Sequence, residues 1–454
     1  MRITQASIKG LFGVFNHVIP FNLDERITII HAPNGYGKTI VLKMLNGIFN
    51  SRYTELLKIP YKNFQVMFED DSYLEVLKGS SSDAKQQKSS LVLNFNNRPN
   101  GQENKSLNLE FDHNDIGKLS SSMLEESFPG LYRTSPREWA YGPTGESLEL
   151  EEVIEKFKYD LPPSRNRNLR NEKWFNELKE KVSVYLIESQ RLLSFSENRN
   201  EKRRMGRVPI SPSLTVNSYS NELVYEIKER LTSYASVSQS LDRSFPTRVL
   251  KQRAYEDLTS EELLKKLEEL EKDRSGLIET GLLEHDKDES PQIPQDEIDE
   301  SMRNILSVYV KDVEEKLRVF DDITRKIDLF RRIINLKFSY KELTISREKG
   351  FIFRSKYPDE YENSSGDLSP DSLSSGEQHE LVLLYELLFK VKGNSLVLID
   401  EPELSLHVGW QISFLRDLKE ISKLVNSDFL IATHSPSIVN GRWDLTVELK
   451  GLPR

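Results

Sequence analysis

A glycine-rich segment near the amino terminus, APNGYGKT at residues 32–39, carries residue types that bind phosphate. It matches the pattern G-x-x-x-x-G-K-[ST] at every position except the first, where alanine stands. Glycines let backbone N–H groups approach phosphate oxygens, the lysine reaches the β- and γ-phosphates, and the threonine hydroxyl ligates Mg²⁺. The segment therefore predicts a site for ATP and Mg²⁺, and its expected binding residues are Asn34, Gly35, Gly37, Lys38 and Thr39.

Ala32 and the flanking elements decide whether this loop can work. A small residue with negative φ can serve at the start of the turn, so Ala32 is expected to leave phosphate contact intact. Residues 26–30 (RITII) form an apolar run typical of a buried strand, and a helix is expected to start near Lys38. That helix points its positive end at the anion.

Two adjacent carboxylates, Asp400 and Glu401, follow a second apolar run at residues 396–399 (LVLI). A parallel strand there delivers both to the carboxyl edge of a sheet, where ligands bind in open α/β folds. Hydrolysis of a bound nucleotide needs a magnesium carboxylate and a base for the attacking water. We expect Asp400 to hold Mg²⁺ and Glu401 to be the general base.

A second anion site is predicted where hydroxyl and amide donors stand at the start of a helix that runs through residues 381–389. One P-loop binds one γ-phosphate, so this site is expected to serve the nucleotide of a neighbouring subunit in a head-to-head pair, with a larger ring as an extension. Its expected residues are Ser374, Ser375, Gly376 and Glu377.

His434 follows another apolar strand and is placed to hydrogen-bond the γ-phosphate or the attacking water. A lone histidine is more often structural, but here it accompanies the other elements. The run at residues 182–193 (VSVYLIESQRLL) reads as a buried strand that ends in a polar turn containing Gln190.

The order of these elements resembles ABC-type ATPase heads: P-loop, Gln turn, LSSGEQ, LVLIDEPE and ATHS. IDEPELSLHVGWQ and ATHSPSIV are similar to the OLD-like branch. YLIESQRLL and residues 234–250 (YASVSQSLDRSFPTRVL) resemble stand-alone ATPases of bacterial anti-phage systems, the ATPase subunits of PARIS systems being nearest. The resemblance implies that Gln190 senses Mg²⁺ and the γ-phosphate, that Ser374 and Gly376 form the signature, and that residues 405–407 form a D-loop crossing to the partner subunit.

Composition narrows the class of protein. The 454 residues, 37% hydrophobic, can bury a large core, and the chain has no cysteine for disulfides or metal sites. No run of 18 apolar residues and no secretory leader is found, so we expect a cytoplasmic protein without membrane contact. The net charge of −9 argues against a surface that coats nucleic acid generally.

The fold expected is α/β: an ABC-type ATPase head of mixed and parallel sheets with helices, interrupted by a helical hairpin insertion. The expected parts are an amino-terminal lobe with a β insertion at residues 1–190, a helical insertion at 191–337 and a carboxy-terminal lobe at 338–454. Apolar residues at 3- and 4-residue steps predict long helices over 259–283 and 296–336, the first opened by a capping box of Thr259 and Glu262. Either a helical subdomain packed on itself or a protruding coiled-coil arm fits this hairpin (about 259–336).

The spacing of the motifs indicates which process ATP hydrolysis would drive. Gln190 lies 152 positions after Lys38, too far for a transporter subunit, and the 20 residues after His434 are too few for a nuclease domain. Two classes remain. One is a sensor or scaffold that controls a separate effector protein, expected to be a Toprim-like nuclease, in response to a phage-encoded trigger. The other is a DNA-repair or DNA-clamping ATPase.

Two charged segments separate these classes. Residues 198–207 (NRNEKRRMGR) hold five basic residues and one acidic residue and form a candidate DNA surface. Residues 256–300 hold 17 acidic and 5 basic residues, which repel phosphates and suit a basic protein partner. We therefore favour the sensor, with DNA as the less favoured partner.

Overall fold

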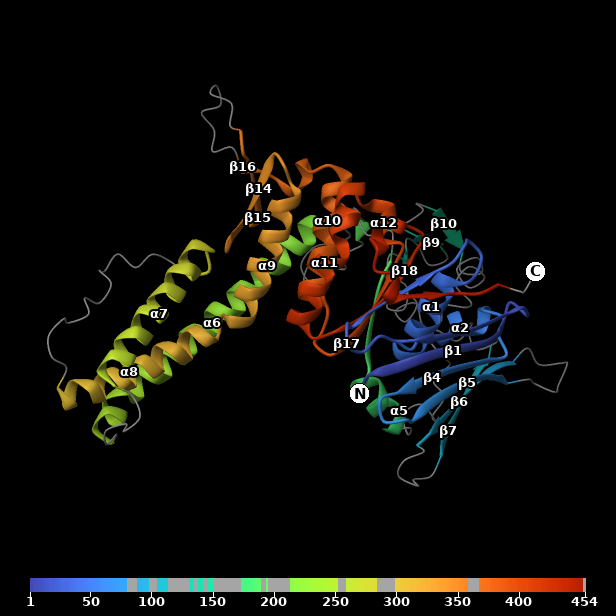
Figure 1. Cartoon of the computed structure of the whole chain (residues 1–454), viewed down its shortest axis with the longest axis horizontal. Coiled ribbons are helices and arrows are strands. Elements are labelled where there is room, and N and C mark those ends of the chain that lie inside the picture. The colour runs from blue at the N-terminus through green and yellow to red at the C-terminus, as the bar shows by residue number, and fades with distance from the viewer. Residues whose placement is uncertain are drawn as a thin grey trace. The chain divides into compact units, whose positions relative to one another are not determined.

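The structure, a computed structural model, forms two compact units, Met1–Thr215 with Val382–Arg454, and Val216–Leu381, each described here by itself (Figure 1). The predicted three-part division at residues 190 and 337 stays a prediction. The residues that the structure describes are 1–79, 88–97, 104–112, 131–133, 138–141, 146–149, 173–188, 193–194, 213–251, 259–283, 299–357 and 367–451.

The first unit is built on a five-stranded parallel sheet with strand order β11-β17-β18-β3-β19. Its inner strands are runs of Ile, Leu and Val buried on both faces, the pattern of a sheet covered by helices. The parallel arrangement confirms the prediction from sequence. The strands are β11 (Ser183–Ile187), β17 (Ser395–Asp400), β18 (Asp428–Thr433), β3 (Ile27–His31) and β19 (Thr446–Glu448).

Helices flank this sheet. The helix α1 (Lys38–Phe49) packs against β11, β17 and β18 through an almost entirely buried surface. Further along the chain, α11 (Val408–Val425) packs on the short helix α12 (Pro436–Val439) and on the π-helical turn η3 (Glu386–Lys390). The unit also contains α2 (Tyr53–Lys58) and α5 (Lys173–Lys181).

A six-stranded antiparallel sheet, order β2-β1-β4-β5-β6-β7, shares one apolar core with the parallel sheet. Its antiparallel pairs include the hairpins β4–β5 and β6–β7. The strands are β1 (Ile3–Leu11), β2 (Phe15–Pro20), β4 (Asn63–Phe68), β5 (Tyr73–Gly79), β6 (Lys88–Asn96) and β7 (Lys105–Asp112). A separate three-stranded sheet consists of β8 (Leu131–Arg133), β9 (Glu138–Tyr141) and β10 (Glu146–Glu149). A two-stranded sheet consists of β12 (Leu193–Ser194) and β13 (Ser213–Leu214).

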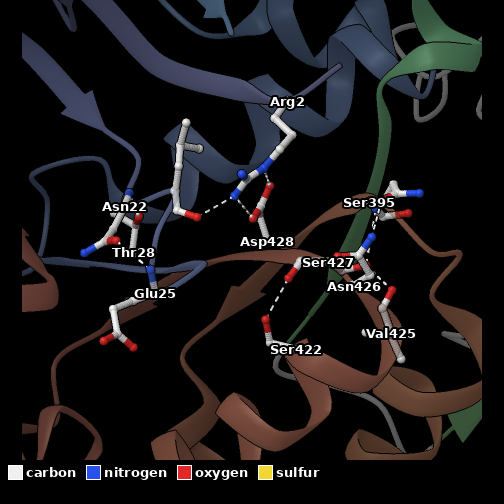
Figure 2. Close-up of polar contacts among 12 residues, drawn as sticks. Arg2, Asn22, Glu25, Thr28, Ser395, Ser422, Val425, Asn426, Ser427 and Asp428 are labelled. Atoms are coloured by element: carbon white, nitrogen blue, oxygen red, sulfur yellow. Dashed lines mark hydrogen bonds and ion pairs between the residues drawn. The ribbon is translucent and has the colours of Figure 1, made fainter.

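A forked ion pair ties the two sheets together (Figure 2). Arg2 Nη2 and Nε lie 2.6 and 2.8 Å from the Asp428 carboxylate, and Nη2 also donates to the Leu23 carbonyl at 2.8 Å. Ser422 Oγ donates to the Ser427 carbonyl at 2.9 Å in the turn before β18. Because Arg2 precedes β1 and Asp428 opens β18, this pair fixes the amino terminus to the strand that leads to His434.

The second unit combines helices with a small sheet (Figure 1). Charged contacts join α6 to α8 (Arg248–Asp312, and Lys316–Asp242 at 2.8 Å), and α7 packs along α8. α7 and α8 thus form a helical hairpin with α6 alongside α8, which fits both the self-packed subdomain and the coiled-coil arm. The elements are α6 (Thr215–Lys251), α7 (Ser260–Glu279), α8 (Glu300–Arg318), α9 (Asp321–Lys337), β14 (Lys341–Ser346), β15 (Gly350–Ser355), β16 (Asp367–Leu368), η2 (Pro370–Ser372) and the part of α10 (Ser375–Tyr385) up to Leu381.

Two details of the helices differ from expectation. The single helix predicted over 296–336 is wrong, because the chain breaks at Val319 and Phe320 between α8 and α9. Phe320 is fully buried and packs 5.3 Å from the Tyr234 ring, while two aspartates at the start of α9 favour a new helix amino terminus there. The capping box of Thr259 and Glu262 is confirmed. Across the described part of the chain, no helix is both long and apolar enough to cross a membrane.

Candidate nucleotide site

The glycine-rich loop joins β3 to α1, as the sequence predicts, and its glycines are needed for their backbone angles. Gly35 and Gly37 have φ of 85° and 90°, the left-handed region that side chains disfavour. A Cβ at Gly37 would lie 2.7 Å from Leu11 Cδ2, so that position is closed to a side chain. A Cβ at Gly35 would meet nothing within 4 Å, so the loop is open there.

Ala32 fits the loop without strain. It is buried, and it is absent from the residues with positive φ, so glycine is not required for its conformation. Its carbonyl accepts a hydrogen bond from Lys38 Nζ at 2.8 Å. The departure from the glycine pattern therefore leaves the loop geometry intact.

The Lys38 side chain is buried in this loop and is surrounded by functional groups. Its Nζ also lies 3.4 Å from the Pro33 carbonyl and contacts both ring nitrogens of His434. Burial lowers the pKa of Lys38, and the charges of Glu401, Glu403 and Asp400 oppose that shift. A phosphate placed here would meet a partly desolvated ammonium group, which strengthens their attraction.

Thr39 and Asp400 supply the oxygen atoms that suit Mg²⁺. Thr39 Oγ1 donates to Asp400 Oδ1 at 3.0 Å, joining the start of α1 to the end of β17. Burial raises the pKa of Asp400, the Thr39 hydrogen bond lowers it, and the charge of Glu401 raises it further. Magnesium sites combine one or two carboxylate or hydroxyl oxygens with substrate phosphates, so this donor set fits the ion.

Glu401 has an unusual backbone, with φ 44° and ψ 58°. Its N–H donates to the Ala432 carbonyl at 2.8 Å, which holds it against the end of β18. Its Oε1 lies 3.6 Å from His434 Nε2. Left-handed conformations of non-glycine residues cluster at functional sites, where surrounding structure maintains them. Glu401, His434 and Lys38 therefore form one contiguous group.

Sequence reasoning missed two residues that connect this group. Glu403 Oε1 accepts the main-chain N–H of His434 at 2.6 Å. Gln411, on α11, donates to the carbonyls of Glu403 and Leu406 and accepts from Ser435 Oγ at 2.8 Å. A third acidic residue close after Asp400 and Glu401 was the available signal for Glu403. A polar residue on the buried face of an amphipathic helix was the signal for Gln411.

His17, also missed, supports the loop from β2. Its Nε2 lies 2.9 Å from the carbonyl of Tyr36, which is part of the glycine-rich loop. Burial lowers the pKa of His17, while that backbone contact raises it. The Phe15 ring stacks with the His17 ring and with the Tyr36 ring, at 5.7 and 5.4 Å between centroids. A histidine two residues after a single phenylalanine on a strand carries no specific sequence signal for this role.

The predicted signature residues lie in the second unit, at the start of α10 as expected. Ser374 precedes the helix, and its N–H and Oγ donate to Glu377 Oε2 at 2.8 and 2.9 Å. Lys341 Nζ donates to the same oxygen at 2.8 Å. Burial raises the pKa of Glu377, but the bonds from Lys341 and Ser374 outweigh it and the pKa is lowered. Ser375 and Gly376 form the first turn of α10.

Gln190 and residues 405–407 are the two remaining predicted elements. Gln190 lies outside the described residues, so its predicted roles toward Mg²⁺ and the γ-phosphate stay predictions. Residues 405–407 follow the carboxylates, the first closing the 3₁₀ turn η4 (Pro402–Ser405) and His407 capping α11. The structure thus brings together the glycine-rich loop, Asp400, Glu401 and His434 within the first unit.

Comparison with known proteins finds similar solved structures and one matching family. Three solved structures are similar at low overall scores: an SMC head bound to the C-winged helix domain of ScpA (12% identity, 96% of this chain and 91% of that chain, TM-score 0.33), the SMC head domain from Thermotoga maritima (13%, 97% and 91%, 0.32), and an Smc head domain with a coiled coil and joint derived from Pyrococcus yayanosii (12%, 96% and 93%, 0.30). The model of one family, AAA_15, described as an AAA ATPase domain, matches residues 1–439. Since that match spans nearly the whole length, the chain belongs to this family of ATPase domains.

Proposed function

We propose that the first unit binds ATP with Mg²⁺ and hydrolyses it at the site of Lys38, Thr39, Asp400, Glu401 and His434. The main support is the direct bond between Thr39 and Asp400, because it joins the two oxygen ligands that Mg²⁺ needs from segments far apart in the chain. Mg²⁺, when bound, neutralises charge on the phosphates. The proposal is tested by measuring phosphate release from ATP with and without Mg²⁺.

Each side chain has a separate role in this proposal. Lys38 offers its ammonium group to the phosphates and must leave His434 to do so, since the two side chains are now in contact. Glu401 accepts the proton of the attacking water as general base. His434, 3.6 Å from Glu401, orients that water or the terminal phosphate. Gln190 is proposed to sense Mg²⁺ and the γ-phosphate.

We further propose that hydrolysis needs two copies of the chain. Ser374, Ser375, Gly376 and Glu377 lie at the start of α10, where helix amides suit an anion supplied by another subunit, and the Ser374 hydroxyl would join them on leaving Glu377. Residues 405–407 are proposed to cross to that subunit. Such a head-to-head pair shares two ATP sites and can extend into a larger ring.

The biological role proposed is that of a sensor or scaffold that controls a separate effector in bacterial anti-phage defence, as in PARIS systems. Its support is the sequence resemblance and the acidic segment at residues 256–300, which suits a basic partner. A Toprim-like nuclease is the expected effector and a phage-encoded protein the expected trigger. Neutralising Glu284, Asp286, Asp288 and Glu289 should weaken effector capture more at low than at high salt, with basal ATPase activity unchanged.

A DNA-repair or DNA-clamping ATPase is the alternative, favoured by the five basic residues at 198–207. It predicts that DNA stimulates hydrolysis and that reversing the charges of Arg203, Arg204 and Arg207 removes the stimulation. The acidic substitutions would then have no effect. Assaying both variant sets by effector pull-down and by ATPase activity with and without DNA separates the two roles, and DNA stimulation lost with the arginines would reject the scaffold.

A further inference from the structure

The two carboxylate oxygens of Glu403 differ in their hydrogen bonding. Oε1 accepts a hydrogen bond from the main-chain N–H of His434. Oε2 is buried and has no hydrogen-bond partner among the described residues. A carboxylate oxygen is a strong acceptor, and buried polar atoms are nearly always hydrogen-bonded in folded proteins. The unpartnered oxygen is therefore available to accept a further hydrogen bond within the site.

The bond to His434 lies where the backbone needs support. β18 ends at Thr433, so the N–H of His434 comes one residue beyond the strand. A charged acceptor at 2.6 Å makes this bond short and strong. A neighbouring hydrogen bond, from the Glu401 N–H to the Ala432 carbonyl, joins the end of β17 to the end of β18 as well. Glu403 thus fixes the position from which the His434 ring reaches Lys38.

The charge of Glu403 acts on the same site. Burial lowers the pKa of Lys38, and Glu403 is one of the three carboxylates whose charge opposes that shift. A carboxylate within such reach of the phosphate-binding lysine also repels a bound phosphate. Removing its charge should therefore leave nucleotide affinity unchanged or increase it, whereas collapse of the loop would reduce affinity.

We infer that Glu403 is a positioning residue of the ATPase site, whose Oε1 clamps the His434 backbone and whose Oε2 remains an acceptor within the site. This inference rests on the proposed function. Glu403 forms and breaks no covalent bond, and Glu401 keeps the role of general base.

Glu403→Gln separates turnover from binding. Glutamine can still accept from the His434 N–H, but it replaces the second oxygen with an NH₂ donor. We expect kcat to fall roughly 10- to 100-fold, the usual effect of losing a hydrogen bond to a charged group, while the Kd for ATP stays equal or decreases. Glu69→Gln, at an exposed carboxylate outside the site, should change neither. An unchanged kcat, or a Kd that increases in parallel with the loss of kcat, would overturn the inference.

A second measurement does not depend on hydrolysis. The chain has seven histidines, so ¹⁵N-histidine labelling gives few amide signals, and His434→Ala assigns the one of interest. The His434 amide should exchange slowly with solvent in the wild type and in Glu403→Gln, and quickly in Glu403→Ala. Rapid exchange in the wild type would reject the clamp even if ATP is hydrolysed. A protected amide in a protein without ATPase activity would support the clamp and reject the proposed function.

Discussion

Thr39 donates its hydroxyl hydrogen to Asp400 at 3.0 Å although 361 positions separate them in the chain. The contact exists because β17 and β3 lie in one parallel sheet with β18 between them, so their carboxyl ends meet at one edge. α1 starts at that edge directly after β3 and the glycine-rich loop. The strand order therefore assembles the proposed magnesium ligands before any ligand binds.

Lys38→Ala should abolish ATP binding in the micromolar range, because the loop loses the charge that pairs with the phosphates. Isothermal titration calorimetry with ATP and Mg²⁺ measures this directly. Lys9→Ala, at an exposed lysine outside the loop, is the matched control and should bind normally. Undiminished affinity in Lys38→Ala would contradict the phosphate role of this lysine.

Glu401→Gln should keep ATP binding and lose roughly 10² to 10⁴ in turnover, the usual contribution of a positioned base. Glutamine has the same shape and tolerates the left-handed backbone about as poorly as glutamate, so the turn at φ 44° should be preserved. Phosphate release under single-turnover conditions reports the loss. Normal hydrolysis would place the base at another residue.

The affinity for Mg²⁺ should decrease as the pH is lowered through the raised pKa of Asp400. Burial favours the neutral carboxyl, so this side chain is protonated at a higher pH than an ordinary aspartate. Mg²⁺ binds the carboxylate, and affinity is therefore full above that pKa and lost below it. Titrating Mg²⁺ in the presence of ATP at several pH values tests the sign. Asp400→Asn should bind Mg²⁺ weakly throughout, and a wild-type affinity independent of pH would contradict the assignment.

The sequence alone predicts the three strands that lead into the proposed nucleotide site, because each is a short buried apolar run. Ile27–His31 leads into the glycine-rich loop, Ser395–Asp400 ends at Asp400, and Asp428–Thr433 is followed by His434. The order of these strands along the chain is visible in the sequence. Their order within the sheet depends on which strands pair, and the sequence does not show this.

Other features could not be read from sequence for physical reasons. The helix breaks at Phe320, although the spacing of apolar residues in the sequence continues through that position. The buried contact of Phe320 with Tyr234 outweighs the local preference for a continuous helix. The Glu403 and His17 contacts are made to backbone groups, and a backbone partner leaves no trace in residue type. The motif alone indicates the position of the proposed signature residues in the sequence. The hydrogen bond from Lys341 to Glu377 depends on how β14 packs near the start of α10, which the motif does not show.

Asp428→Asn should destabilise the first unit by about 1–3 kcal/mol, since it leaves the partly buried Arg2 guanidinium without its charged partner. Urea unfolding monitored by circular dichroism measures the change. Glu448→Gln, at an exposed position on β19, should leave the midpoint unchanged. An unchanged midpoint in Asp428→Asn would mean that the Arg2 pair contributes nothing to stability.

Mixing two inactive variants should restore part of the ATPase activity if the site is shared between subunits. Lys38→Ala removes the phosphate lysine, and Ser374→Arg blocks the start of α10. In a mixed pair one site combines both defects, whereas the other combines an intact glycine-rich loop from one chain with an intact signature from its partner. At most half of the wild-type activity per pair is therefore expected.

Concentration dependence provides the control for this mixing experiment. Specific activity of the wild type should rise with protein concentration as pairs form, and each variant alone should stay inactive at every concentration. A strict monomer that hydrolyses ATP fully, with activity independent of concentration and no recovery on mixing, would show that both anion sites act within one chain. In that case Ser374 would act on the nucleotide held by its own Lys38, and the proposed head-to-head pair would be wrong.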